Sequence, residues 1–410
     1  MKAYILTLLL SVSSLHLLWS QPFLGQTKNI QSESLASDQQ IHVYLPDNYE
    51  KGDKKYPVLY ILDGQWFYLN GIAIQKTLRG ENVLPEMIIV GVDMKSRQVH
   101  DSILNNKWDE YASFIKKELV SYVDQTYRTN QDRVLFGWEN NAFLASELII
   151  RESSPFTGAI VSNGGSMDEK MVESFNKYSN DQKPKYLFMA NSDKDIYTVR
   201  YSNNFAKDLT EQNFSNLTWE YRKFNEETHE SLPYLSMYHG LRFYYHNYGS
   251  IVYASIDDFH QKGGIPYLRG YFRQRGERFD QDTEIDNSTK NTLIWMAWKE
   301  DNFSSFDLFM KEFTDVLDTK RYASAYWQNR LAQFYLKYGD VANAIVYFNR
   351  GIQKYPDPKY LAKMHAGLGE AYRSKGDRKL AVKNLKMAVS CATQNNDPKL
   401  ADYESLLKKK

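Results

Sequence analysis

The chain has 410 residues, of which 42% are hydrophobic and 25% charged, and its formal net charge at pH 7 is +1. This length and composition predict two globular domains and exclude a disordered or collagen-like chain. Because the opposite charges nearly cancel, no strong field attracts nucleic acid or an anionic membrane, and we expect no nucleic-acid partner.

The N-terminal residues show the pattern of a secretory signal peptide. Lys2 supplies one positive charge, an apolar run covers residues 4–19, and the small residue Ser20 follows. The run is too short and too mixed for a stable membrane span. We predict that residues 1–20 are removed on export and that the mature chain begins near Gln21, without a membrane span. The single cysteine, Cys391, cannot form an internal disulfide, which favours a periplasmic or secreted bacterial protein.

Residues 28–250 alternate between strand and helix patterns. An alternating run predicts a strand near a sheet edge at 41–45, and further strands are predicted at 159–161 and 217–221. Continuous apolar runs predict strands buried on both faces at 58–62, 87–92, 134–136 and 186–190. Helical spacing predicts helices at 108–127, 142–151, 199–209 and 232–245. Such alternation is typical of a mostly parallel sheet sandwiched between helices.

A sharp turn is predicted where the strand at 134–136 runs into the next helix. In the nucleophile elbow of α/β-hydrolases, G-x-S-x-G, this turn carries a serine. Here Gly137 occupies the first glycine position, Glu139 replaces the serine, and Asn141 replaces the second glycine. The order of strand, sharp turn and helix indicates the α/β-hydrolase fold, whereas Glu139 at the serine position argues against catalysis by a serine nucleophile.

Residues 287–405 show only helical spacing, together with a repeat. Gly339-Asp340 and Gly376-Asp377 each precede small and apolar residues at helical intervals. Small residues allow close helix approach, and Gly-Asp predicts the turn between paired helices. The pattern resembles the tetratricopeptide repeat, with a degenerate earlier unit at 292–313. We predict that residues 251–286 form a mixed connection between the two domains.

Several motifs, in the same order, resemble the bacterial putative-esterase family, which includes the enterochelin and ferric-siderophore esterases. They are the strand and turn at 56–64, a second signature at 85–92, the approach to the elbow at 127–137, and the catalytic-histidine segments at 228–233 and 238–242. The resemblance covers about residues 30–250. It implies an α/β-hydrolase with a doubly wound, mostly parallel sheet, and some members also carry tetratricopeptide-like C-termini.

The resemblance assigns the catalytic histidine to His229. The acid that orients it is expected in the loop after the strand at 186–190, where Asp193 is the first choice and Asp195 the second.

By the same resemblance, the oxyanion hole consists of backbone N–H groups of Asn140 and of the turn at Gly64 and Gln65. Glu139 places a carboxylate beside this hole, and we expect that carboxylate to occupy it at neutral pH.

A carboxylate is a poor substitute for the missing serine. Its attack on an ester gives an anhydride, and glutamate is longer than the aspartate with which some α/β-hydrolases cleave carbon–halogen bonds. Three other hydroxyls, those of Ser146, Ser162 and Ser166, lack the strained turn into a helix that a nucleophile needs. The segment at 102–110 lacks the family's usual sequence, which indicates a rebuilt substrate pocket.

Three hypotheses follow. The first is an exported family member that has lost serine-esterase activity, retains a site for a small ester, siderophore or peptide-like ligand, and uses its helical repeats to dock on the hydrolase domain or to bind a partner protein. The second is an active carboxylic-ester hydrolase that uses His229, with Glu139 as a general base on water. The third is an interaction scaffold in which both domains bind only protein. The eight histidines are scattered and no glycine-rich phosphate loop is present, so we predict neither metal nor cofactor.

Overall fold

The computed structural model describes residues 24–151, 154–167, 169, 172–173 and 184–409. The predicted signal peptide at 1–20 lies outside them. The contacts within the chain divide it after Gly249 into two compact units. In the part of the chain that is described, no helix is both long enough and apolar enough to cross a membrane.

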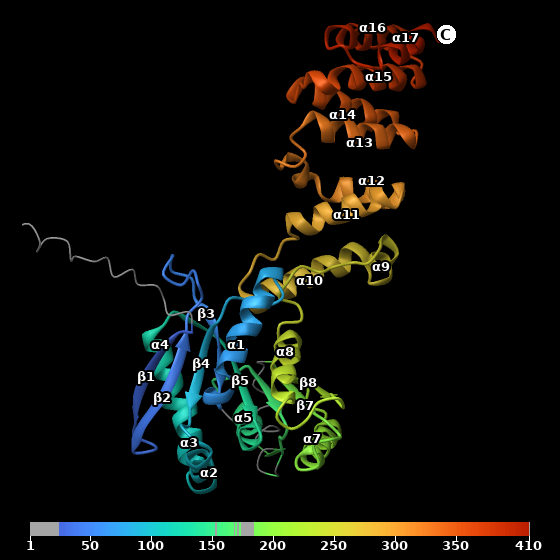
Figure 1. Cartoon of the computed structure of the whole chain (residues 1–410). Coiled ribbons are helices and arrows are strands. Elements are labelled where there is room, and N and C mark those ends of the chain that lie inside the picture. Colours follow the sequence, from blue (N-terminus) through green and yellow to red (C-terminus); the bar gives the residue numbers. More distant parts are fainter. Residues whose placement is uncertain (1–23, 152–153, 168, 170–171, 174–183, 410) are drawn as a thin grey trace, which may run out of the picture. The chain divides into compact units, whose positions relative to one another are not determined.

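The first unit is built on one eight-stranded sheet with the order β1-β2-β4-β3-β5-β6-β7-β8 (Figure 1). Strands β1 and β2 form an antiparallel hairpin and β2 pairs antiparallel with β4, whereas every pair from β4 to β8 is parallel. The predicted doubly wound, mostly parallel sheet is therefore confirmed. The strands are β1 Gln26–Ser32, β2 Ser37–Tyr44, β3 Tyr56–Ile61, β4 Ile88–Asp93, β5 Thr129–Trp138, β6 Gly158–Ser162, β7 Lys185–Asn191 and β8 Leu217–Lys223.

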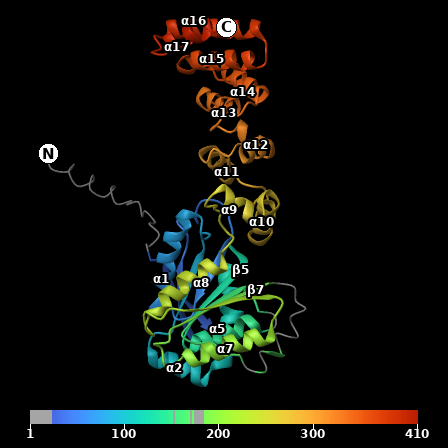
Figure 2. The same ribbon diagram turned by 90° about the vertical axis from the view of Figure 1, so that its right-hand side faces the viewer.

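Helices cover both faces of this sheet. They are α1 Gly64–Leu78, the short η1 Arg79–Glu81, α2 Arg97–Asn106, α3 Trp108–Ser113, the π-helical turn η2 Phe114–Leu119, α4 Val120–Thr126, α5 Asn140–Ile150, α7 Val199–Gln212 and α8 Leu232–Tyr244. Helices α1 and α8 contact each other and run side by side in Figure 2. Two helical glycines permit close packing on the sheet, because a Cβ at Gly71 would press on Ile61 and one at Gly240 on Ile160.

The opposite face of the sheet carries the larger core. Alternate strand residues such as Val58, Tyr60, Leu135 and Val161 pack there with buried side chains of α3, η2, α4, α5 and α7. Because both faces are covered, the strands read as continuous apolar runs. The segment at 102–110, predicted to be a rebuilt part of the substrate pocket, is helical in α2 and α3, of which only the part from residue 108 was predicted as helix. The Ser96 side chain caps α2 by accepting from the N–H of Val99.

The second unit is entirely helical, which confirms the predicted C-terminal all-α region. Its elements are α9 Ile256–Gln261, α10 Gly264–Phe279, α11 Asn287–Lys299, α12 Phe303–Glu312, η3 Thr314–Asp318, α13 Ala325–Lys337, α14 Val341–Lys354, α15 Pro358–Ser374, α16 Arg378–Gln394 and α17 Leu400–Lys408. Thus residues 251–286, predicted as a mixed connection, contain two helices. Gly263, which precedes α10, and Gly264, its first residue, have positive φ angles of 106° and 62°.

The two Gly-Asp pairs lie at the turns α13–α14 and α15–α16. Gly339 and Gly376 have positive φ angles of 77° and 88°, which favour glycine. Asp340 and Asp377 then cap the following helices, accepting from the N–H groups of Asn343 and Leu380 at 3.0 and 2.9 Å. Each pair therefore ends one helix and starts the next.

Candidate active site

The strained turn lies between β5 and α5, with Glu139 at its apex. The φ and ψ angles of Glu139 are 50° and −119°, a backbone conformation that a residue with a side chain adopts only at a cost. Neighbouring backbone comes close on both sides: a Cβ at Gly137 would collide with Asn141, and one at Gly164 would lie 2.8 Å from the Glu139 carbonyl oxygen. Gly164, which follows β6, was not singled out from the sequence.

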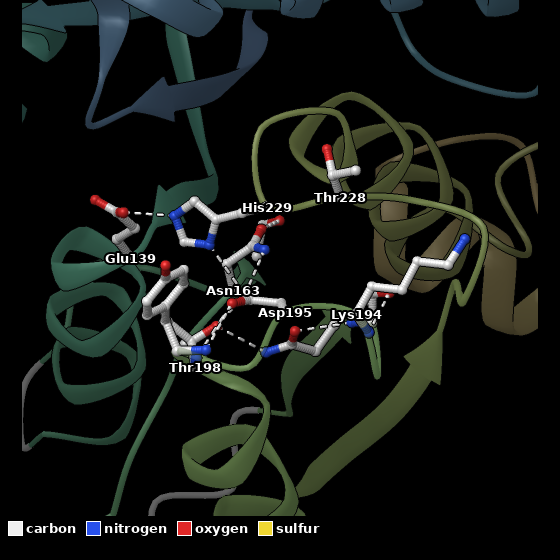
Figure 3. A network of polar contacts seen from close by, with 12 residues as sticks. Glu139, Asn163, Lys194, Asp195, Thr198, Thr228 and His229 are labelled. Carbon is white, nitrogen blue, oxygen red and sulfur yellow. Dashed lines mark hydrogen bonds and ion pairs between the residues drawn. The ribbon is translucent and has the colours of Figure 1, made fainter.

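Three side chains meet in a line beside this turn (Figure 3). His229 Nε2 lies 2.5 Å from Glu139 Oε1, and His229 Nδ1 lies 3.0 Å from Asp195 Oδ2. Glu139 follows β5, Asp195 follows β7, and His229 lies between β8 and α8. The arrangement is that of a hydrolase triad in which a carboxylate occupies the place of the nucleophilic hydroxyl.

The acid that contacts His229 is Asp195 and not Asp193, the first choice from the sequence. A turn in which the Asp195 N–H donates to the Ser192 carbonyl carries Asp195 inward, where its side chain is fully buried. The amide of Asn163 donates to it at 2.9 Å and the hydroxyl of Thr198 also donates to it. Asp193 instead forms an ion pair of 2.6 Å with Lys223, and 54% of its side chain is exposed.

Arg97 completes the site, and sequence reasoning missed it. Its Nη1 lies 2.7 Å from Glu139 Oε2, its Nε lies 3.2 Å from Asp101, and its guanidinium carbon lies 5.6 Å from the Trp138 ring centre. The spacing of Arg97 and Asp101 on one helix is visible in the sequence, but nothing there connects residue 97 with residue 139.

The charges of this site stabilise one another. The hydrogen bond to Glu139, and in addition the Asp195 carboxylate, raise the pKa of His229 to about 9, against the opposing effect of burial. Burial raises the pKa of Glu139, but the His229 and Arg97 contacts outweigh it and hold the pKa below its ordinary value. At neutral pH the site therefore contains two carboxylates, one imidazolium and one guanidinium.

A second polar cluster lies behind the elbow and explains Asn141. The Asn141 amide donates to Asp63 Oδ1 at 2.9 Å, and His100 Nε2 lies 3.4 Å from the same oxygen. The side chains of Asp63 and His100 are fully buried, and burial raises the pKa of Asp63 to about 7. In this chain the residue at the second glycine position ties the first turn of α5 to the end of β3.

The backbone groups expected to form an oxyanion hole lie at two helix N-termini. Gly64 and Gln65 begin α1, Asn140 begins α5, and within the described part of the chain the side chains of the N-cap residues Asp63 and Glu139 make no capping hydrogen bond. Among the described contacts, the Glu139 carboxylate reaches His229 and Arg97 rather than these N–H groups. The expectation that it fills the hole is therefore corrected, because the two cations hold it elsewhere.

Two of the serines considered as substitutes for the missing nucleophile have hydroxyl groups that are already hydrogen-bonded to other groups of the chain. Ser146 is buried and donates to the Ala142 carbonyl at 2.8 Å. Ser162 is buried, donates to Asn163 and accepts from Ser236. Ser166 is partly exposed. Within the described ranges, the nitrogen contacts of His229 run to Glu139 and Asp195, and no hydroxyl is paired with this imidazole.

Aromatic rings line the outer side of the triad. The ring centres of Trp138 and Tyr197 lie 5.1 and 6.3 Å from that of His229, and Trp66 packs edge-on against Trp138. Tyr197 and its neighbour Ile196 are each 76% exposed. The exposed ring of Tyr197 therefore places apolar surface beside His229. No group of three candidate metal ligands was found among the residues that the structure describes.

Comparison with known proteins finds similarity to one family in part of the chain. The model of a family described as "Putative esterase" matches residues 32–139. The uncharacterized protein YjcH of Bacillus subtilis is 29% identical over 184 residues, which cover 42% of this chain and 75% of that protein.

Two solved structures share the fold. An IroE-like serine hydrolase from Shewanella oneidensis matches with a TM-score of 0.50 and 20% identity, covering 70% of this chain and 98% of its own. An uncharacterised protein from Capnocytophaga ochracea matches with a TM-score of 0.57 and 17% identity, covering 80% of this chain and 94% of its own. Both matches are longer than the first unit and therefore extend into the helical unit.

Proposed function

We propose, from the premise that this chain belongs to the Putative esterase family through its first unit, that the unit binds a small ligand and does not hydrolyse esters by serine-type acyl transfer. The contact of 2.5 Å between Glu139 Oε1 and His229 Nε2 carries this proposal. It occupies the imidazole nitrogen that would have to accept a proton from a nucleophile.

The protonation state supports the same conclusion. A histidine whose pKa is about 9 is an imidazolium at neutral pH and has no lone pair for general-base catalysis. Glu139 keeps its negative charge because its pKa is lowered, so it is a weak base as well. Hydrolysis by Glu139 acting on water is disfavoured because a separation of 2.5 Å leaves no room for a water molecule between the two side chains.

The ligand that suits this site is a small ester, siderophore or peptide-like molecule that presents an apolar or aromatic group. The rings of Trp66, Trp138 and Tyr197 support this choice, because aromatic side chains bind apolar groups and leave their polar edges free for orientation. Its polar part would lie near the charged triad.

The test of lost activity uses the purified chain without residues 1–20 and p-nitrophenyl acetate and butyrate as substrates. We expect the wild type and His229→Ala to release p-nitrophenol at the same rate, equal to that of buffer alone. Wild-type turnover above this background that disappears in His229→Ala would overturn the proposal and establish the active-hydrolase alternative.

The test of ligand binding uses the methyl ester of benzoylserine and follows the imidazole signals of His229 by NMR. We expect saturable shifts that weaken in Tyr197→Ala and persist in Tyr234→Ala, a matched tyrosine that is 45% exposed on α8. Unchanged His229 signals at saturating ester would contradict binding at this site.

We also propose that the protein is exported to the periplasm or secreted. The charge and apolar run of residues 1–20 support this, and these residues lie outside the described part of the chain. Mass spectrometry of the protein from cells should find a mature N-terminus near Gln21, and a retained Met1 in the exported fraction would contradict cleavage.

A further inference from the structure

A recess in the second unit, far along the sequence from the triad, is lined by large rings. It has an empty volume of about 290 Å³ between α11, α12 and α13. Its lining, called here the tryptophan pocket, consists of Ile294, Trp295, Trp298, Phe306, Tyr322, Trp327, Arg330 and Leu331. Trp295 is 41% exposed and belongs to the surface of the unit, so the pocket is accessible to another molecule.

Three cations surround the tryptophan pocket and lie against its rings. The guanidinium carbon of Arg330 is 4.0 Å from the Trp298 ring centre, that of Arg321 is 5.0 Å from Trp327, and Lys299 Nζ is 4.9 Å from Trp295. Such stacking stabilises a cation only partly.

Some other cations of the same unit are neutralised by carboxylates. Lys290 pairs with Asp315 at 2.5 Å, and Arg350 pairs with Asp318 at 2.6 Å. Within the described residues no carboxylate forms an ion pair with Arg321, Arg330 or Lys299, so the rim of the tryptophan pocket carries positive charge that a ligand can neutralise.

The open shape of the pocket distinguishes a side chain from a free metabolite. Pockets for drug-sized ligands enclose most of the molecule. The volume of about 290 Å³ here includes space that is open to the solvent, so the pocket covers one side chain of a partner rather than enclosing a free molecule. Tryptophan, tyrosine and arginine are also the residues that contribute most of the binding energy at protein interfaces.

We propose that the tryptophan pocket binds a partner protein by taking up one aromatic or large aliphatic side chain that is flanked by aspartates or glutamates. The apolar side chain fills the ring-lined recess, and the flanking carboxylates pair with Arg330, Lys299 and Arg321. The site is independent of the triad and of the function proposed for it.

The experiment is a selection of random peptides displayed on phage with the immobilised full chain as the target. We expect the enriched sequences to share one aromatic or aliphatic residue with acidic neighbours. The consensus peptide, made synthetically and dye-labelled, is then titrated by fluorescence anisotropy. A copy with alanine at the apolar position and a copy with lysines replacing its acidic residues should both lose binding.

Two matched variants test whether the consensus peptide binds at the tryptophan pocket. Arg330→Gln should weaken the consensus peptide about tenfold, the loss expected when one strong interface contact is removed. Lys383→Gln, which removes one exposed cation on α16, should leave the affinity unchanged, and circular dichroism verifies that both variants are folded. The proposal is wrong if no peptide is enriched, if the consensus is basic or lacks an apolar residue, or if Arg330→Gln and Lys383→Gln bind equally.

Discussion

The triad of the first unit and the tryptophan pocket of the second use the same residue types, carboxylates, cations and rings, in opposite ways. In the triad, Glu139 and Asp195 neutralise Arg97 and His229 within the chain itself. In the tryptophan pocket, the cations lie against rings, without a carboxylate in the described residues. An internally neutralised site has little to gain from an ionic ligand, whereas the pocket gains from one. The difference teaches that a cluster of charged residues indicates a site for an ionic ligand only if other residues of the chain do not already neutralise those charges.

The largest change in the triad is expected when the Glu139 carboxylate, which neutralises Arg97 and His229, is removed. Glu139→Ser supplies a hydroxyl at the elbow and lowers the pKa of His229, because the largest cause of its elevation is lost. We expect p-nitrophenyl butyrate hydrolysis to rise about 10²- to 10⁴-fold over the wild type, the usual contribution of general-base catalysis. Glu139→Ala serves as the matched control and should stay inactive, as should Glu139→Ser combined with His229→Ala. An inactive, folded Glu139→Ser would mean that the surroundings of the triad have diverged as well.

Asn141→Gly, which restores the second glycine of G-x-S-x-G, should instead lower the stability of the protein. It leaves the buried Asp63 carboxyl without its amide donor and adds a helical glycine, which together cost about 2–4 kcal/mol. Asn204→Gly, at an exposed position of α7, provides the control and should cost only about 1 kcal/mol. Urea unfolding of the first unit measures both. Equal losses in the two variants would show that the Asp63 contact adds no stability.

A smaller effect is expected from pH. The folded-state pKa of His229 lies above its unfolded value, so its contribution to stability is complete below about pH 6.5 and is lost as pH rises through about 9. After allowance for solvent screening we expect a loss of about 2 kcal/mol over this window in the wild type, and a smaller loss in Glu139→Gln.

NMR titration of the His229 imidazole and urea unfolding at each pH measure this effect. Glu226→Gln, which removes a carboxylate whose side chain is 96% exposed, should behave like the wild type. An imidazole of the wild type that titrates near pH 6.5 would refute the paired state.

The sequence predicted the sheet because burial on both faces leaves a local signal. Continuous apolar runs such as residues 58–62 and 87–92 identified the central strands. The first strand, Gln26–Ser32, was not predicted because it is a polar edge strand in which only alternate residues near its end are buried. Residues 256–279 were not recognised as helices because Gly263-Gly264 was interpreted as part of a connection.

Residues of the candidate site could be predicted only where they belong to a sequence motif within one continuous segment. The elbow and the segment around His229 each form a recognisable local motif, and the structure brings them together. Arg97 has no such motif, since its contact with Glu139 depends on how α2 follows β4. The choice between Asp193 and Asp195 depends on the direction of one turn, which composition does not encode.

The separation of the triad in sequence has a consequence for biosynthesis. Glu139 and His229 lie 90 residues apart, and the turn that carries His229 follows β8, one of the two edge strands of the sheet. A ribosome therefore exposes Glu139 and Arg97 well before the histidine that joins them emerges. Until the segment after β8 is present, Glu139 lacks one of the two cations that hold it, and the triad cannot be complete.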